Sequence, residues 1–135
     1  MKKKFEIIEH TADVRFRIFG RDLKEIFENA AWVLSWVAVG EPPKKLPLRE
    51  RIEISAPDQN FLLADFLNEI LAKMQIRKAV FPRLEIIELC QTRLVAQILG
   101  VPTPSFREDI KAVTYHELKI RKNSGRLETN LIFDV

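Results

Sequence analysis

Polar residues gather near the start of the chain in a way that a simple turn does not require. The stretch EHTAD, residues 9–13, places two carboxylates, an imidazole and a hydroxyl between two apolar runs. A tight turn between two strands needs only residues such as Gly, Asn or Asp. The stretch is therefore either an enlarged polar turn or a point at which the fold brings ligands together.

Further acidic groups lie at the other end of the sequence. Asp134 is followed by Val135, whose α-carboxylate is an additional oxygen donor. Together with Asp13, these groups would form a metal site of hard oxygen ligands, which suits Ca²⁺ or Mg²⁺. Zinc is disfavoured because the chain has only two His and one Cys. The alternative is that both aspartates are ordinary strand-edge residues with local hydrogen bonds, and spacing alone does not separate these interpretations.

The first half of the chain predicts the elements that position Asp13. Residues 5–8 and 14–18 predict two strands, and alternation of apolar and basic side chains makes the second half-buried. Residues 22–38 and 58–74 predict amphipathic helices, because apolar side chains recur every three or four positions behind an Asp that can cap the helix. The proline-rich segment 41–50 predicts a linker.

The second half predicts mostly strands, at residues 51–56, 84–89, 93–99, 110–121 and 127–135. We therefore expect one domain, residues 1–135, of the α+β class. Its two amphipathic helices would pack on one face of a largely antiparallel or mixed β-sheet.

The last two predicted strands determine where Asp134 lies. Asn123-Ser-Gly125 predicts a hairpin turn between them, and matching their apolar faces leaves two registers open. One places Asp134 opposite Val113, with Lys111 as its diagonal neighbour. The other places Asp134 opposite Tyr115. The same alternation assigns His116 to the apolar side of its strand, as a core histidine.

Composition and charge narrow the class of protein. The chain has 135 residues, of which 47% are hydrophobic and 30% charged, with a formal net charge of +3. This is the composition of a soluble globular domain. Basic residues are interleaved with acidic ones, which argues against direct nucleic-acid binding. No apolar run approaches the roughly 20 residues of a membrane span. The basic residues at the start are not followed by the apolar segment of a signal peptide. We expect a cytoplasmic protein without membrane contact.

Three of these stretches also carry a family resemblance. FEIIEHTADV at residues 5–14, DIKAVTYH at residues 109–116 and the terminal IFDV are similar to the corresponding segments of the archease family. The resemblance extends over the whole chain in order. The sequence departs from the family in GVPTPSFRED, residues 100–109, which is shorter than usual and has Val101 where a Glu is common.

The resemblance implies an α+β domain and the role of an accessory protein. The resemblance implies a chaperone-like activator of the RtcB-type RNA ligase, which joins tRNA halves during tRNA splicing. The implied role is to help the ligase form its guanylylated intermediate from GTP and a divalent cation (Ca²⁺, Mg²⁺ or Mn²⁺) and to turn over repeatedly. Such a protein is not itself an enzyme, and it would meet tRNA only through the ligase.

Carried over position by position, the resemblance assigns Asp13 and Asp134 to metal binding and Lys111 to a positive charge beside them. His10 joins Lys111 among the residues expected to matter for activation. Two other functions stay open from the residues alone. One is a self-standing metal-dependent phosphohydrolase that uses Asp13, Asp134 and His10, and the other is a tRNA-binding module.

Overall fold

Two helices and eight strands make up the part of the chain that the computed structural model describes, residues 3–10 and 13–135, with the side chains of residues 8–10 excepted. The helices are α1 (Leu23–Val39) and α2 (Gln59–Arg77). The strands are β1 (Phe5–His10), β2 (Asp13–Gly20), β3 (Leu48–Ser55), β4 (Ala79–Leu89), β5 (Arg93–Pro102), β6 (Ala112–Val113), β7 (Arg121–Asn123) and β8 (Arg126–Asp134).

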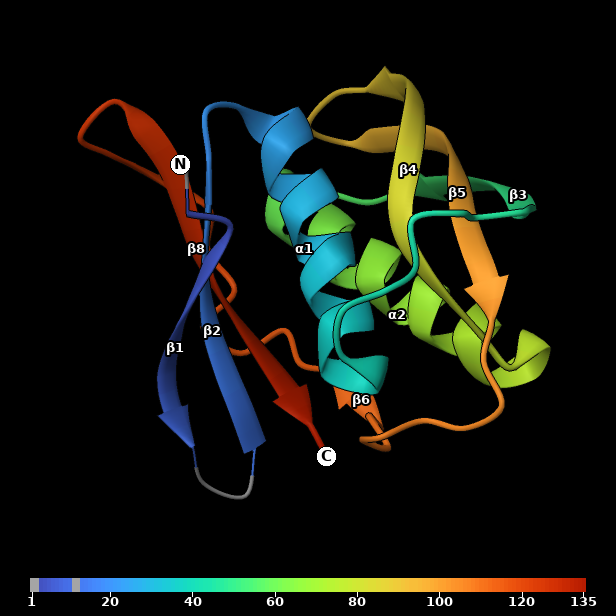
Figure 1. The fold of residues 1–135 in the computed structure, drawn as a ribbon. Coiled ribbons are helices and arrows are strands. Elements are labelled where there is room, and N and C mark those ends of the chain that lie inside the picture. The colour runs from blue at the N-terminus through green and yellow to red at the C-terminus, as the bar shows by residue number, and fades with distance from the viewer. Residues whose placement is uncertain (1–2, 11–12) are drawn as a thin grey trace.

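The strands form two sheets rather than the single sheet that we expected. One sheet has the order β1-β2-β8-β6, with β7 also pairing with β8, and the other has the order β3-β5-β4. All of these pairings are antiparallel. The α+β class is confirmed. The linker after α1 carries the chain past this helix to β3, so the later strands begin a second sheet on its other side (Figure 1).

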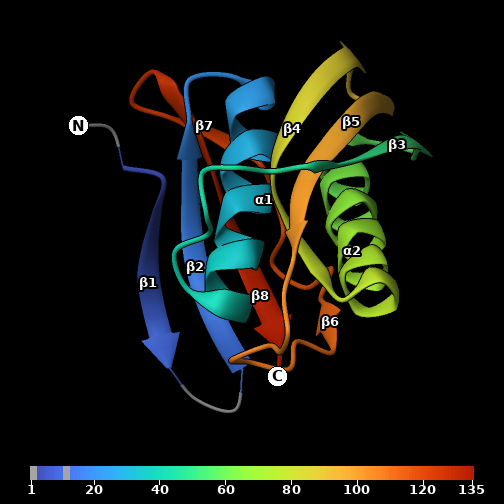
Figure 2. The ribbon, with the colours of Figure 1, turned by 45° about the vertical axis from the view of Figure 1, so that its right-hand side comes forward.

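Helix α1 lies between the two sheets, which explains its broad apolar surface. It contacts β2 and β8 of the first sheet and β4 of the second, and Figure 2 shows it between these layers. Helix α2 packs against the three-stranded sheet and β6. The predicted helix starts are confirmed, since Asp22 accepts a hydrogen bond from the Glu25 N–H at 2.9 Å and Asp58 caps α2 in the same way.

Aromatic side chains fill the space between the layers. Five phenylalanines from helices and both sheets are essentially inaccessible to solvent, namely Phe16, Phe27, Phe66, Phe81 and Phe133. Burial of each such side chain stabilises the fold by about 1.5–3 kcal/mol. Phe16 on β2 lies 5.7 Å from Phe133 on β8, measured between ring centres, so the two strands that carry the aspartates share one core contact.

The hairpin at the end of the chain agrees with the sequence prediction. Asn123 pairs with Arg126, which leaves Ser124 and Gly125 as a two-residue turn. Their φ angles are +54° and +80°. Two positive φ angles define the turn type that matches the twist of antiparallel strands, and Gly adopts this conformation without a steric cost.

The long strand predicted at residues 110–121 is wrong. Only β6 and β7 remain of it, and the residues between them leave the sheet. Side-chain amides on one face of α2 bind the backbone of this segment instead, so it does not need a continuous strand partner. Gln75 Nε2 donates a hydrogen bond to the Ile110 carbonyl at 3.1 Å, and Asn68 bonds to both backbone groups of Val113. Asn60 Oδ1 accepts a hydrogen bond from the Ile120 N–H at 2.8 Å.

Candidate functional site

Asp13 and Asp134 lie opposite each other on neighbouring strands. Asp13 is the first residue of β2, and it pairs with Asp134, the last residue of β8. Directly opposed residues in an antiparallel pair have Cβ atoms about 4.5–5.5 Å apart. Both views place the end of the chain beside the start of β2 (Figures 1 and 2). Two acidic residues 121 positions apart in the sequence are thus brought side by side.

The two aspartates face away from the core. Val14 and Phe133, the next pair along the same strands, are 8% and 0% exposed. Successive side chains in a strand point to opposite faces, so Asp13 and Asp134 project from the outer face of the sheet. The Asp134 side chain is exposed and Asp13 is half-buried. A carboxylate pair at this position is open to a cation or to another molecule.

Both predicted registers for Asp134 are wrong. Ala112 pairs with Asp134, and Val113 pairs with Phe133 rather than with Asp134. The assumed alternation fails at β6, because Val113 is 1% exposed and points inward whereas Ala112 is half-buried. Ile110 and Leu118, on the side predicted to be apolar, are buried as expected, so the segment does not alternate as one continuous strand.

Lys111 nevertheless lies next to the acidic pair. Its backbone N–H donates a hydrogen bond to the Asp134 carbonyl oxygen at 2.7 Å, and its side chain is exposed. The neighbouring Val113 is held by Asn68 of α2, whose Nδ2 donates to the Val113 carbonyl at 2.8 Å and whose Oδ1 accepts from the Val113 N–H at 2.9 Å. Helix α2 therefore fixes β6, the short strand that directly follows Lys111.

Arg15 supplies a positive charge that the sequence analysis did not assign to the site. Its Nε lies 3.3 Å from Asp13 Oδ1, and its guanidinium also lies 3.1 Å from Glu117 Oε2. The hydrogen bond to Asp13 raises the pKa of Arg15 above its usual value. Arg15 follows Asp13 by two positions in a strand, so the two share one face. This spacing was the available signal in the sequence.

The segment after β6 adds polar and aromatic side chains beside this cluster. His116, predicted to lie in the core, has a 79% exposed side chain, and its Nε2 is 3.4 Å from Glu117 Oε2. Tyr115 donates a hydrogen bond to Asp65 and stacks against Phe61 at 5.6 Å between ring centres. The bond to Asp65 raises the pKa of Tyr115. Both rings are exposed large side chains of this segment and of α2.

Part of the opening polar stretch lies outside the described residues. Thr11 and Ala12 are not described, and neither are the side chains of Glu9 and His10. His10 is the last residue of β1 and pairs through its backbone with Val14. The structure thus places His10 one strand away from the acidic pair but does not test its expected role in activation.

The donor set of the acidic pair suits a cation that prefers oxygen ligands. Two opposed carboxylates offer hard oxygen donors of the kind that Ca²⁺ and Mg²⁺ bind, with water completing the shell. Among the side chains that the structure describes, those of residues 3–7 and 13–135, no group of three or more His, Cys, Asp or Glu could hold a metal ion. Val135 packs its side chain against the core directly after Asp134.

The fold and the site together define a small α+β protein with an acidic pair at the adjoining ends of two neighbouring strands. Neither described helix is long and apolar enough to cross a membrane. The chain belongs to the archease family, because the model of the archease protein family (MTH1598/TM1083) matches residues 5–135.

Relatives and solved structures agree with this assignment. The chain is 35% identical to protein archease of Pyrococcus abyssi over 142 residues, which cover 98% of this chain and 99% of the relative. It is 28% identical to protein archease of Methanosarcina mazei, with 98% and 97% covered. The solution structure of protein 1598 of Methanobacterium thermoautotrophicum matches with a TM-score of 0.79 and 29% identity, covering 98% of this chain and 99% of that one.

A fourth comparison supports the fold alone. The crystal structure of an archease from Thermotoga maritima, described as a possible chaperone, has a TM-score of 0.65 at 23% identity. The match covers 100% of this chain and 98% of that chain. The overall fold is thus shared with a protein whose sequence has diverged widely.

Proposed function

We propose that this protein is a non-catalytic activator of an RtcB-type RNA ligase in tRNA splicing. It would promote GTP- and metal-dependent guanylylation of the ligase and so permit multiple turnover. Membership of the archease family supports the accessory role. The observation that carries the proposal is the pairing of Asp13 with Asp134, since it brings together two carboxylates that could hold a cation.

Asp13 and Asp134 would hold the divalent cation, Ca²⁺ or Mg²⁺/Mn²⁺, with the α-carboxylate of Val135 as a further ligand. Such a cation neutralises phosphate charge and orients the groups that react in phosphoryl and nucleotidyl transfer. Lys111 and His10 would contribute to activation from either side of the pair. Arg15 must then give up Asp13 as a partner, and Glu117 gives its guanidinium a second carboxylate already within 3.1 Å.

The decisive experiment is a guanylylation assay of the cognate ligase with GTP, with and without this protein. Wild-type protein is expected to accelerate guanylylation and to convert a single round of tRNA ligation into many. Asp13→Asn and Asp134→Asn should abolish both effects, because each removes one of the two opposed carboxylates. Unchanged stimulation by either variant would exclude the acidic pair from the function.

Matched variants distinguish the loss of a site residue from the loss of a charge elsewhere on the protein. Glu85→Gln removes an exposed carboxylate from the other sheet and should leave stimulation intact. Lys111→Gln is expected to impair stimulation, whereas Lys122→Gln in the terminal hairpin should not. A peptide tag placed after Val135 should weaken cation binding if the α-carboxylate is a ligand, and equal cation affinity with and without the tag would remove that ligand.

The two other functions from the sequence analysis make different predictions. A phosphohydrolase would cleave GTP or RNA on its own with Mg²⁺ or Mn²⁺, and we expect purified protein to show neither activity. A tRNA-binding module would bind tRNA without any ligase, and its affinity would fall steeply with salt concentration. Hydrolysis or salt-sensitive tRNA binding by the isolated protein would favour the corresponding alternative.

A further inference from the structure

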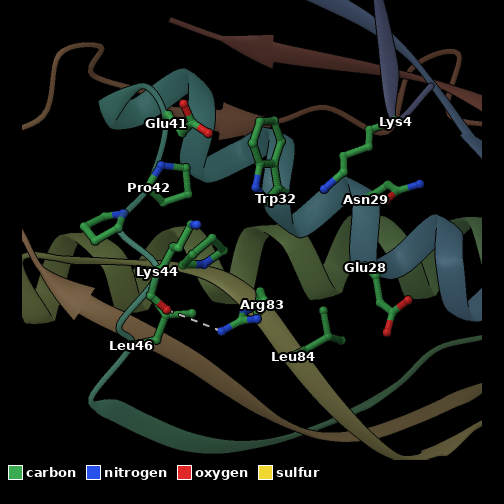
Figure 3. A pocket seen from close by; sticks show the side chains of 12 residues that line it. Lys4, Glu28, Asn29, Trp32, Glu41, Pro42, Lys44, Leu46, Arg83 and Leu84 are labelled. Carbon is green, nitrogen blue, oxygen red and sulfur yellow. Dashed lines mark hydrogen bonds between the residues drawn. The ribbon is translucent and has the colours of Figure 1, made fainter. Parts of the chain in front are cut away.

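A cleft separate from the acidic pair lies where the linker after α1 passes over that helix and β4. Its volume is about 530 Å³, and Figure 3 shows the side chains that line it. They come from the residue before β1, from α1, from residues 41–46 and from residues 82–84 of β4. This volume is within the range of small-molecule sites, roughly 300–1,000 Å³. Neither aspartate of the acidic pair borders it.

Three positive side chains converge on this cleft. Lys4 Nζ lies 4.8 Å from the centre of the Trp32 ring, and Arg83 donates a hydrogen bond to the Lys44 carbonyl at 3.4 Å. In Figure 3, the Lys4 and Lys44 side chains approach Trp32 from opposite sides of the view, with Arg83 below. In the described part of the chain, no carboxylate oxygen lies within 4.0 Å of any of the three cationic groups. Elsewhere on this surface arginines such as Arg17, Arg49 and Arg93 do have carboxylate partners.

The other walls combine flat apolar rings with polar side chains. Trp32 is half-buried, and proline rings from the linker and from β4 border the same cleft. An aromatic ring provides a face on which a nucleobase can stack, and the proline rings extend the apolar surface beside it. Glu28 and Glu41 also border the cleft. Their carboxylates can accept hydrogen bonds from the amino and ring N–H groups of a base.

We propose that this cleft binds a nucleoside phosphate, with the base against Trp32 and the phosphate between Lys4, Lys44 and Arg83. A phosphate group needs cations that are not already neutralised, and the three basic side chains meet that condition. The base needs a flat apolar wall close to those cations, which Trp32 and the prolines supply. The same chemistry is presented by a free mononucleotide and by the phosphorylated end of an RNA strand.

Nuclear magnetic resonance of the ¹⁵N-labelled wild-type protein tests this proposal. The chain has two tryptophans, so two indole N–H signals are expected, and Trp36→Phe assigns the signal of Trp32. Titration with AMP should shift the Trp32 signal in a saturable way. Ribose 5-phosphate, which lacks the base, and adenosine, which lacks the phosphate, should each bind more weakly than AMP. A 5′-phosphorylated tetranucleotide that binds more tightly than AMP would identify an RNA end as the source.

Variants test the role of the three cations. Arg83→Gln and Lys44→Gln should each weaken AMP binding by about fivefold or more, as expected for the loss of one charge-assisted contact. Lys122→Gln removes the same charge from a hairpin outside the cleft and should leave AMP affinity unchanged. Asp13→Asn should also have no effect, so this result is independent of the ligase assay. The proposal is wrong if AMP and the tetranucleotide leave the Trp32 signal unmoved, if adenosine binds as well as AMP, or if Arg83→Gln binds AMP like wild type.

Discussion

Asn68 links α2 to the short strand beside the acidic pair, and its replacement is the most direct test of how the site is held. The side chain makes three hydrogen bonds: Nδ2 to the Ala64 carbonyl at 3.1 Å, Nδ2 to the Val113 carbonyl at 2.8 Å, and Oδ1 from the Val113 N–H at 2.9 Å. In Asn68→Ala both backbone groups of Val113 lose their partner. Because Val113 is 1% exposed, water cannot easily take the place of the lost amide side chain as a hydrogen-bond partner.

The expected cost follows from these contacts. Leaving a buried donor or acceptor without a partner costs about 1–3 kcal/mol. With two such groups on one residue and partial relaxation, we expect Asn68→Ala to lower the free energy of unfolding by about 2 kcal/mol. If the loss is local, opening of β6 becomes easier by the same amount, which corresponds to roughly 30-fold faster hydrogen exchange. The affected amides are those of Lys111, Val113 and Thr114, of which the first and last bond to β8.

Hydrogen exchange measured residue by residue distinguishes this local effect from a general loss of stability. Asn29→Ala is the matched control, because Asn29 on α1 donates one hydrogen bond to the Phe19 carbonyl at the far end of β2. It should lower global stability without selectively exposing β6. Protection of Val113 that is equal in Asn68→Ala and Asn29→Ala would refute the conclusion that the amide of α2 holds this strand.

Three further predictions concern the site, the sheet and the surface. Arg15→Gln should raise the affinity for Ca²⁺ several-fold in calorimetry, because the arginine competes with a cation for Asp13, and a lower affinity would mean that Arg15 helps to hold the ion. Gly100→Ala should lower the stability by more than about 2 kcal/mol in denaturant unfolding, since the added Cβ would meet a backbone carbonyl oxygen of β4. The hydrogen bond from Lys73 lowers the pKa of Glu50 below its ordinary value of 4.5, so this pair stabilises the fold above that pH and the contribution is lost as the pH falls through the lowered pKa. Glu50→Gln should therefore make the loss of stability in acid less steep, and an identical pH profile would contradict this assignment.

Local features of the structure could be predicted from the sequence. The caps Asp22 and Asp58 and the turn at Ser124-Gly125 depend on residues within a few positions of one another. The apolar spacing of both helices is equally local. These elements appear where the pattern of the sequence indicated them.

The segment from 110 to 121 shows why the rest could not be predicted. Its alternation is typical of a strand, but three amide side chains of α2 compete for its backbone. Asn60, Asn68 and Gln75 recur at intervals of eight and seven residues, which places them on one helical face. In the sequence they are indistinguishable from ordinary solvent-facing polar residues. Only the packing of α2 against β6 reveals their partners.

The acidic pair likewise combines features that the local sequence predicts with a strand pairing that it does not. The sequence placed Asp13 and Asp134 at strand ends, yet it could not show that β2 and β8 are neighbours. That pairing joins segments about 120 residues apart, and no local rule determines it. Arg15 and Glu117 became visible as members of the site only once that neighbourhood was known.

The position of β8 also has a consequence in time. It is the last strand in chain order, yet it lies inside its sheet, with β2 on one side and β6 and β7 on the other. Until the ribosome has made the roughly one hundred residues between β2 and β8, the backbone amides and carbonyls on one side of β2 have no strand partner. An unpaired strand edge of this kind can pair with other chains and promote aggregation. The nascent chain is therefore exposed to aggregation through β2 before the acidic pair can form. Addition of β8 completes the sheet and brings Asp134 opposite Asp13 in the same step.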